Sequence, residues 1–105
     1  MKSKILLVDD DPFTRTLFEN LFRSGSIELV SATCMAEARR AFDAVDFNLA
    51  ILDQRLPDGN GLDLFAEMRQ LRPRQMAVMI TGYAEVRDAM RAVREGLFDY
   101  LTKPF

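Results

Sequence analysis

Short apolar runs alternate with longer segments of helical periodicity along the whole sequence, and this alternation restricts the fold more than any other feature. The runs are Ile5–Val8, Leu29–Ala32, Leu49–Leu52, Met76–Ile80 and Tyr100–Leu101. Continuous apolarity over so few residues is typical of strands buried on both faces, as in a parallel sheet. Strands that alternate with helices predict an open α/β sheet. A closed eightfold barrel needs about 250 residues, whereas this chain has 105.

The first two helices are expected between residues 11 and 25 and between residues 31 and 45. Asp11 is an N-cap acid with Pro12 at the first helical position, and Gly25 stops the helix. Ser31 or Thr33 can cap the second helix. The apolar stripe of the first helix is Phe13, Leu17 and Leu21, and the residues expected to face inward from the second are Met35, Ala38, Phe42 and Val45.

The third and fourth helices are expected at about Leu62–Arg72 and about Glu85–Glu95. Pro73 ends the third helix, and Gly96 is the expected C-cap of the fourth. Their apolar residues at helical spacing are Phe65, Met68 and Leu71 in the third and, expected to face inward, Val86, Ala89, Met90 and Val93 in the fourth. No repeat or Pro/Gly/Ser-rich linker divides the elements, so residues 1–105 are interpreted as one domain.

Reactive side chains follow four of the five predicted strands, at the point where each strand ends. They are Asp9 and Asp10 after the first strand, Asp53 after the third, Thr81 after the fourth and Lys103 after the fifth. In open parallel sheets, ligands bind just beyond the carboxyl ends of the strands, where the strand order reverses. The sequence therefore predicts one crevice with two or three carboxylates, a hydroxyl and an ammonium group.

Carboxylates gathered in this way need either a proton or a cation. Two carboxylates about 4 Å apart repel by roughly 4 kcal/mol at an effective dielectric constant of 20, which corresponds to about 3 pK units. The ligands available are carboxylates and backbone carbonyls in the loop after Asp53, with no cluster of His or Cys. Oxygen-only ligation by few protein groups favours Mg²⁺ over zinc.

The remaining groups of the predicted crevice suit a phosphoryl group. The Thr81 hydroxyl and the backbone N–H of Gly82 are hydrogen-bond donors, and Lys103 supplies a point charge. Phosphoryl transfer needs mainly positioning and charge neutralisation, which these groups provide together with a cation. Asp53 is the predicted nucleophile, because it stands alone after the central strand while the acids after the first strand can hold the metal. The product would be an aspartyl phosphate.

Four segments together resemble the receiver domains of two-component response regulators. They are ILLVDDD at 5–11, LDQRLPDGNG at 52–61, ITGY at 80–83 and YLTKPF at 100–105, in the expected order over nearly the whole chain. The resemblance implies a flavodoxin-like open sheet of five parallel strands in the order 2-1-3-4-5. It also implies that Asp53 accepts a phosphoryl group from the phosphohistidine of a histidine kinase or phosphotransfer protein. The domain would catalyse its own phosphorylation and dephosphorylation rather than turn over small molecules.

The same resemblance assigns the metal ligands. Asp10 and Asp53 would bind Mg²⁺ directly, and the main-chain carbonyl of Arg55 would complete the protein ligands. Asp9 would act through a water molecule.

The resemblance also implies a switch. Thr81 and Lys103 would bind the phosphoryl oxygens, and Thr81 would draw its loop towards the active site. The ring of Tyr100 would then turn inward, which makes the fourth helix and fifth strand the output face. The bond between Lys103 and Pro104 would be a cis peptide that aims the lysine inward.

Two short segments, Gly82–Ala84 and Phe98–Tyr100, are similar to receivers joined to sigma-54-dependent AAA+ activators. Receivers have a fifth helix, whereas this sequence stops at Phe105, so one face of the sheet beside the third to fifth strands would lack cover. We expect either a piece of a longer protein, followed by a transcription-regulating domain, or a domain that dimerises. The dimer would form through the uncovered face or through the fourth helix and fifth strand.

Composition excludes several classes of function. A net charge of −2 and a pI near 5.1 argue against direct contact with nucleic acid. The longest apolar run, Met76–Ile80, is far shorter than the roughly 20 residues of a membrane span, and the N-terminal segment is not expected to be a signal peptide. The single cysteine, Cys34, allows no internal disulfide and favours a cytoplasmic setting.

Other interpretations fit the same residues less well. A haloacid-dehalogenase-like phosphatase carries its nucleophile in Asp-x-Asp-x-Thr/Val after the first strand, and here Phe13 takes the Thr/Val position. A stand-alone phosphorelay receiver without an output domain and a receiver that only docks partners are the alternatives within the family. No Gly-rich phosphate loop follows any strand, which argues against nucleotide binding. Asp11 is interpreted as a helix cap and Asp58 as a turn residue.

Overall fold

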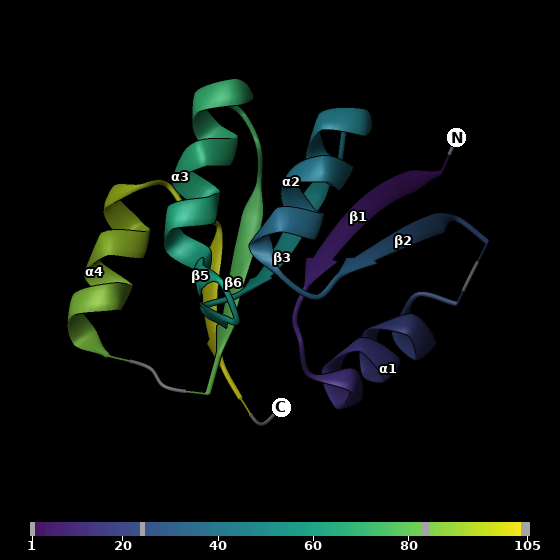
Figure 1. Ribbon diagram of the computed structural model, residues 1–105, viewed down its shortest axis with the longest axis horizontal. Coiled ribbons are helices and arrows are strands. Elements are labelled where there is room, and N and C mark those ends of the chain that lie inside the picture. Colours follow the sequence, from purple (N-terminus) through teal and green to yellow (C-terminus); the bar gives the residue numbers. More distant parts are fainter. Residues whose placement is uncertain (1, 24, 83–84, 104–105) are drawn as a thin grey trace.

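The computed structural model describes residues 2–23, 25–82 and 85–103, which form a sheet with helices on both faces (Figure 1). The strands are β1 (Ser3–Val8), β2 (Ile27–Ala32), β3 (Leu49–Asp53), β4 (Arg55–Leu56), β5 (Gly59–Asn60), β6 (Ala77–Thr81) and β7 (Asp99–Thr102). The helices are α1 (Pro12–Leu21), α2 (Met35–Ala44), α3 (Gly61–Leu71) and α4 (Val86–Arg94). Across the described ranges, none of these helices has the length and apolarity needed to cross a bilayer.

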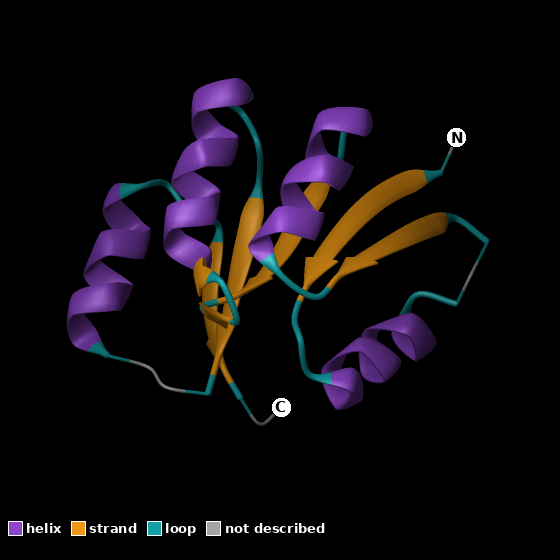
Figure 2. Cartoon of the chain, viewed as in Figure 1, coloured by secondary structure: helices purple, strands orange, loops and turns teal. Residues whose placement is uncertain are grey.

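The main sheet has the strand order β2-β1-β3-β6-β7, with all neighbours parallel (Figure 2). This confirms the predicted order 2-1-3-4-5, since β6 and β7 are the fourth and fifth strands of this sheet. The central strand β3 pairs with β1 through Leu52 and Val8 and with β6 through Asp53 and Ile80. The strands β1, β3 and β6 therefore end close together at one edge.

Two apolar cores lie on opposite faces of the sheet, because successive side chains of a strand point to opposite sides. Helices α2, α3 and α4 cover one face, and α1 lies on the other (Figure 1). The larger core includes Leu6, Leu52, Phe65, Met68 and Met79. The smaller core consists of Ile5, Leu7, Ile51 and Ile80, with residues of α1 and its C-cap packed on it.

The apolar stripe named for the first helix is not the one that packs on the sheet. Phe18 and the C-cap residue Phe22 pack against the smaller core. Phe13, Leu17 and Leu21 are exposed, Phe13 by 86%. The α1 segment therefore has two apolar stripes, and periodicity alone does not tell which of them faces the sheet.

The helix starts agree with the sequence for α1 and differ for α2. Asp11 caps α1 as expected, and its carboxylate accepts a hydrogen bond from the backbone N–H of Phe13 at 2.9 Å. Helix α2 begins after Cys34, whose side chain makes no capping hydrogen bond. The expected caps Ser31 and Thr33 were wrong, because Ser31 belongs to β2 and both residues precede the N-cap position.

Three of the four residues expected to face inward from the fourth helix do not, and only Ala89 is half-buried. Val86, Met90 and Val93 are 61–79% exposed, and the helix instead buries the small side chain of Ala92. Leu71 at the end of α3 is exposed as well, although Phe65 and Met68 of the same helix are buried as expected. Helix α4 thus leaves its larger apolar side chains on the surface.

A two-stranded antiparallel hairpin, β4–β5, was not predicted. Arg55 pairs with Asn60 and Leu56 with Gly59, in the segment that joins the end of β3 to α3. The backbone N–H of Gly61 donates to the carbonyl of Gln54 at 2.7 Å and closes the hairpin. A Cβ at Gly61 would lie 2.2 Å from the backbone oxygen of Asp53, so this close approach requires glycine.

Candidate functional site

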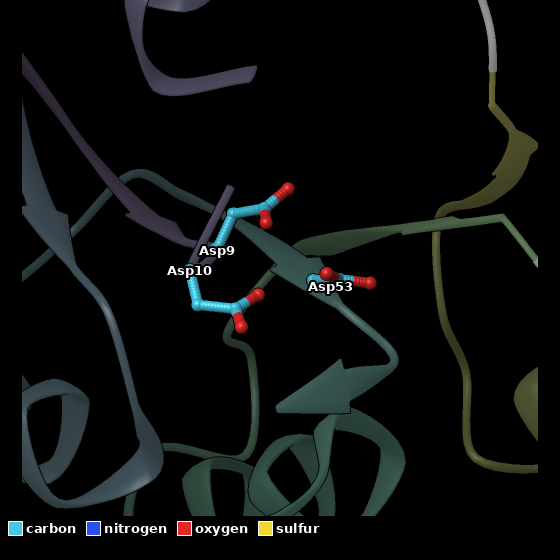
Figure 3. Close-up of side chains that lie close together, drawn as sticks. All are labelled: Asp9, Asp10 and Asp53. Carbon is cyan, nitrogen blue, oxygen red and sulfur yellow. The ribbon is translucent and has the colours of Figure 1, made fainter. Parts of the chain in front are cut away.

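Three carboxyl groups lie together at the edge where β1 and β3 end. Asp9 and Asp10 directly follow β1, and Asp53 is the last residue of β3. One carboxylate oxygen from each of the three lies within 4.8 Å of those of the other two (Figure 3). The side chains of Asp9 and Asp53 are buried and Asp10 is exposed. The parallel register of the sheet therefore brings together acids that are more than 40 residues apart in the sequence.

Lys103 reaches the same group from the end of β7. Its Nζ donates to Oδ2 of Asp9 at 2.9 Å and lies 3.6 Å from Oδ2 of Asp53. Its backbone N–H donates to the carbonyl of Thr81 at 2.7 Å, which fixes the chain just after β7. Although partial burial opposes its charge, the hydrogen bond to Asp9 and the charge of Asp53 raise the pKa of the Lys103 ammonium group.

The environment of Asp53 disfavours its charged form. Burial and the charge of Asp9 raise its pKa to about 6, and the charge of Lys103 opposes this rise. Asp9 already accepts hydrogen bonds from Lys103 and from the backbone N–H of Asp11, at 2.9 Å each. A cation beside Asp10 and Asp53 would therefore relieve a repulsion that Lys103 only partly compensates.

The donor set fits a small hard cation. The three groups are all carboxylates, one of them exposed to solvent, and no His or Cys belongs to the cluster among the described residues. Carboxylate oxygens that leave room for water are the ligands Mg²⁺ prefers. The backbone N–H of Arg55 donates to Oδ1 of Asp53 at 3.4 Å, so the main chain at Arg55 runs beside this carboxylate.

Thr81 and Gly82 lie at the end of β6, next to β3 in the sheet. Thr81 is fully buried, and Gly82 is exposed. A Cβ at Gly82 would meet no atom within 4 Å, so open space lies beside its backbone. Both residues stand at the same edge as Asp53, because Ile80 pairs with Asp53 and Thr81 comes next.

Gln54 is a residue of this site that the sequence reasoning missed. It is buried, follows Asp53 directly, and its Oε1 accepts a hydrogen bond from the Tyr100 hydroxyl at 2.5 Å. Burial and the charges of Asp88 and Glu85 raise the pKa of Tyr100, which keeps the hydroxyl a donor. An uncharged polar residue at the end of an apolar strand was the available signal.

Asp58 is more than the turn residue that its sequence context predicted. Its carboxylate accepts hydrogen bonds from the backbone N–H groups of Met35 at 2.8 Å and Ala36 at 3.1 Å. The bond from Met35 is the largest of the effects that lower the pKa of Asp58. Asp58 therefore caps α2 from a distant loop, a role that only the tertiary structure reveals.

The cis peptide expected between Lys103 and Pro104 lies outside the described residues.

Comparisons with known proteins agree with this geometry. The family described as response regulator receiver domain matches residues 5–105. The response regulator protein PilR of Pseudomonas aeruginosa is 40% identical over 103 residues, which is 98% of this chain and 23% of PilR. The chain spans 22% to 55% of the lengths of the first curated relatives that it matches.

Solved structures of receiver domains and response regulators are also similar to this chain. A CheY-like receiver domain protein from Methanospirillum hungatei has a TM-score of 0.93 at 30% identity, over 100% of this chain and 84% of that one. A response regulator protein from Burkholderia pseudomallei was solved with a phosphorylated aspartic acid, a calcium ion and citrate. It is 32% identical with a TM-score of 0.88, over 99% of this chain and 61% of that one.

Proposed function

Because this chain belongs to the receiver domain family of two-component response regulators, we propose that Asp53 takes a phosphoryl group from a partner's phosphohistidine. The partner is a histidine kinase or a phosphotransfer protein. The observation that carries the proposal is the position of Asp53, whose buried carboxyl group lies beside the two acids after β1 and 3.6 Å from the ammonium group of Lys103. The phosphorylated aspartic acid of the Burkholderia pseudomallei relative supports it.

The proposed reaction is an in-line transfer. A carboxylate oxygen of Asp53 forms the new P–O bond as the P–N bond of the phosphohistidine breaks, and the electron pair of that bond leaves with the imidazole. Lys103, the Thr81 hydroxyl and the Gly82 backbone N–H are proposed to hold the phosphoryl oxygens. A bound Mg²⁺ would supply charge neutralisation for the acidic cluster and the incoming phosphoryl group.

Incubation of the chain with Mg²⁺ and acetyl phosphate tests the proposed function. The intact mass is expected to increase by one phosphoryl group, and hydroxylamine is expected to remove it, since acyl phosphates react with this nucleophile. Omission of the divalent cation is the control and should leave the chain unmodified. A label that resists hydroxylamine would show that no aspartyl phosphate forms.

The proposed Mg²⁺ ligands are the carboxylates of Asp10 and Asp53 and the main-chain carbonyl of Arg55, with Asp9 acting through water. Asp10→Ala is expected to weaken Mg²⁺ binding at least about tenfold, because it removes a charged ligand. Asp11→Ala is the matched control, since Asp11 is the neighbouring acid but caps α1. Calorimetric titration measures both affinities, and equal losses would mean that the ligand is wrongly assigned.

Tyr100 is proposed as the residue that turns inward with phosphorylation, and its hydrogen bond to Gln54 is proposed to stabilise that inward orientation. Gln54→Met removes the acceptor, and a hydrogen bond of about 1 kcal/mol corresponds to an about fivefold change in the inward-to-outward ratio. The chain has two tyrosines and no tryptophan, so Tyr83→Phe leaves Tyr100 as the only tyrosine fluorophore.

Acrylamide quenching of Tyr100 in the Tyr83→Phe chain is therefore expected to increase when Gln54 is replaced. Gln75→Met is the matched control, because Gln75 is equally buried but its side chain bonds to the carbonyl of Met76. Identical quenching in the Gln54 and Gln75 variants would contradict the proposed role of Gln54.

The proposed output and dimer surface is α4 with β7. Val86, Met90 and Val93 are exposed apolar residues of α4. Solvent-facing apolar side chains at this density are typical of a protein interface. The alternative surface is the uncovered face of the sheet, on which Leu101 of β7 is 42% exposed. Sedimentation of variants with polar residues on one surface or the other distinguishes the two. The fifth helix, the transcription-regulating output domain of the sigma-54 type and the cytoplasmic location stay predictions.

A further inference from the structure

The side chain of Asp58 attaches the hairpin β4–β5 to the N-terminus of α2. The two carboxylate oxygens of Asp58 accept one hydrogen bond each from the backbone N–H groups of Met35 and Ala36. These N–H groups belong to the first turn of α2, which has no partner for them within its own helix. Cys34, the N-cap residue, makes no side-chain capping bond. Asp58 thus joins two segments that are 22 residues apart in the sequence.

Packing reinforces this attachment at the next residue. Gly59 lies so close to Met35 that a Cβ at Gly59 would be 2.3 Å from the Met35 sulfur atom. Met35 itself is buried in the larger core. The tip of the hairpin is therefore held against the start of α2 by two hydrogen bonds and by a close contact with a buried side chain.

The other end of the same hairpin borders the phosphoacceptor. Arg55 pairs with Asn60 across the hairpin, and its backbone N–H lies 3.4 Å from Oδ1 of Asp53. Gly61 closes the segment by donating its backbone N–H to the carbonyl of Gln54. The main chain beside Asp53 is consequently fixed on one side by β3 and on the other by the hairpin that Asp58 holds.

We propose that Asp58 is a positioning residue for the cation site: by holding the hairpin on α2, it keeps the main chain at Arg55 in place beside Asp53. This inference rests on the proposed function, which makes the Arg55 carbonyl a metal ligand. Loss of the attachment leaves the carboxylate ligands in place but frees the main-chain ligand. A metal site is sensitive to groups that orient its ligands, and their loss typically weakens binding by about 10–100-fold.

Glu37 provides a matched control on the same helix. Its Oε1 accepts hydrogen bonds from the backbone N–H and the hydroxyl of Thr33 at the start of α2. Those hydrogen bonds lower the pKa of Glu37, as the bonds to Met35 and Ala36 lower that of Asp58. Both acids therefore satisfy groups at the same helix end, but only Asp58 belongs to the hairpin.

The test compares Asp58→Asn and Glu37→Gln in the whole chain, first without metal. Hydrogen exchange of residues 54–60 is expected to be at least about tenfold faster in the Asp58 variant, because Asn offers a single acceptor oxygen for the two N–H groups. The Glu37 variant is expected to exchange like the parent chain in this segment. If Asp58→Asn does not fold, Asp58→Ser is used, whose hydroxyl accepts one bond.

Mg²⁺ titration by calorimetry is the second measurement. Asp58→Asn is expected to weaken binding about tenfold, Glu37→Gln by less than about twofold, and phosphorylation of the Asp58 variant by acetyl phosphate should recover at saturating Mg²⁺. Unchanged affinity in the Asp58 variant, or equal losses in both variants, would overturn the inference. If the parent chain itself binds no Mg²⁺, the proposed function fails, whereas the metal-free exchange still tests the attachment.

Discussion

Asp53→Asn is expected to abolish labelling by acetyl phosphate in the presence of Mg²⁺. The amide of asparagine is not a nucleophile that forms an acyl phosphate, and the other buried carboxylate of the cluster, Asp9, is engaged by Lys103 and by the Asp11 backbone. Asp10 is exposed and is assigned to the metal. Intact-mass spectrometry checks the result, with no detectable phosphorylated species expected from the variant.

Asp46→Asn serves as the control for this experiment. The Asp46 side chain is 91% exposed and pairs with Arg72, which is not one of the site residues. Its replacement should leave labelling unchanged. Persistent, hydroxylamine-sensitive labelling of the Asp53 variant would remove Asp53 from its assigned role and would direct attention to Asp10.

Without a divalent cation, the charge of Asp53 is expected to destabilise the folded chain at neutral pH. Its pKa is about 6 when folded against an ordinary value of 3.8. Between these values the unfolded chain is ionised while the folded chain still holds the proton, so this group's contribution to stability falls as the pH rises from about 4 to about 6. The shift of roughly 2 units corresponds to about 3 kcal/mol.

The measurement is urea unfolding with a chelator, for the parent chain and for Asp53→Asn. Other acids change stability in the opposite direction, since the pKa values of Asp11 and Asp58 are lowered by their hydrogen bonds. The difference between the two chains isolates Asp53. The variant is expected to be more stable by about 3 kcal/mol at pH 7.5, with the difference vanishing near pH 4. A difference that does not depend on pH would contradict this assignment.

Added Mg²⁺ should reverse the order of stability of the parent chain and Asp53→Asn. A ligand that binds only the folded state stabilises it in proportion to the logarithm of its concentration over the dissociation constant. The parent chain is therefore expected to gain stability with added Mg²⁺, whereas Asp53→Asn should gain much less because one charged ligand is missing.

Much of the fold was predictable because short apolar runs and strand ends carry strong local signals. Each run overlaps a strand, and the polar residue after the run stands at the carboxyl end of the sheet, as with Asp53 at the end of β3. The order of the strands came from the resemblance to receivers rather than from periodicity. The burial of α4 was not predictable, because its larger apolar residues, such as Met90, face outward.

The parts of the site that sequence reasoning missed are those that depend on tertiary contacts. Asp58 stands in a segment whose residue types a turn alone would explain. Its hydrogen bond from the backbone N–H of Met35 forms only because the folded chain brings the loop after β3 next to the start of α2. Gln54 likewise acquires its role from Tyr100, 46 residues further along the chain. Residues whose function depends on one distant partner leave no periodic signal in the sequence.

A crystal structure of the chain with Mg²⁺ and beryllofluoride, an analogue of the phosphoryl group, tests the central claim most directly. We expect the analogue on the Asp53 carboxylate, with Lys103 and Thr81 against its fluorine atoms. The ion should be bound by Asp10, Asp53 and the carbonyl of Arg55. An analogue bound at another residue, or Lys103 turned away from Asp53 with the ion held elsewhere, would contradict the account.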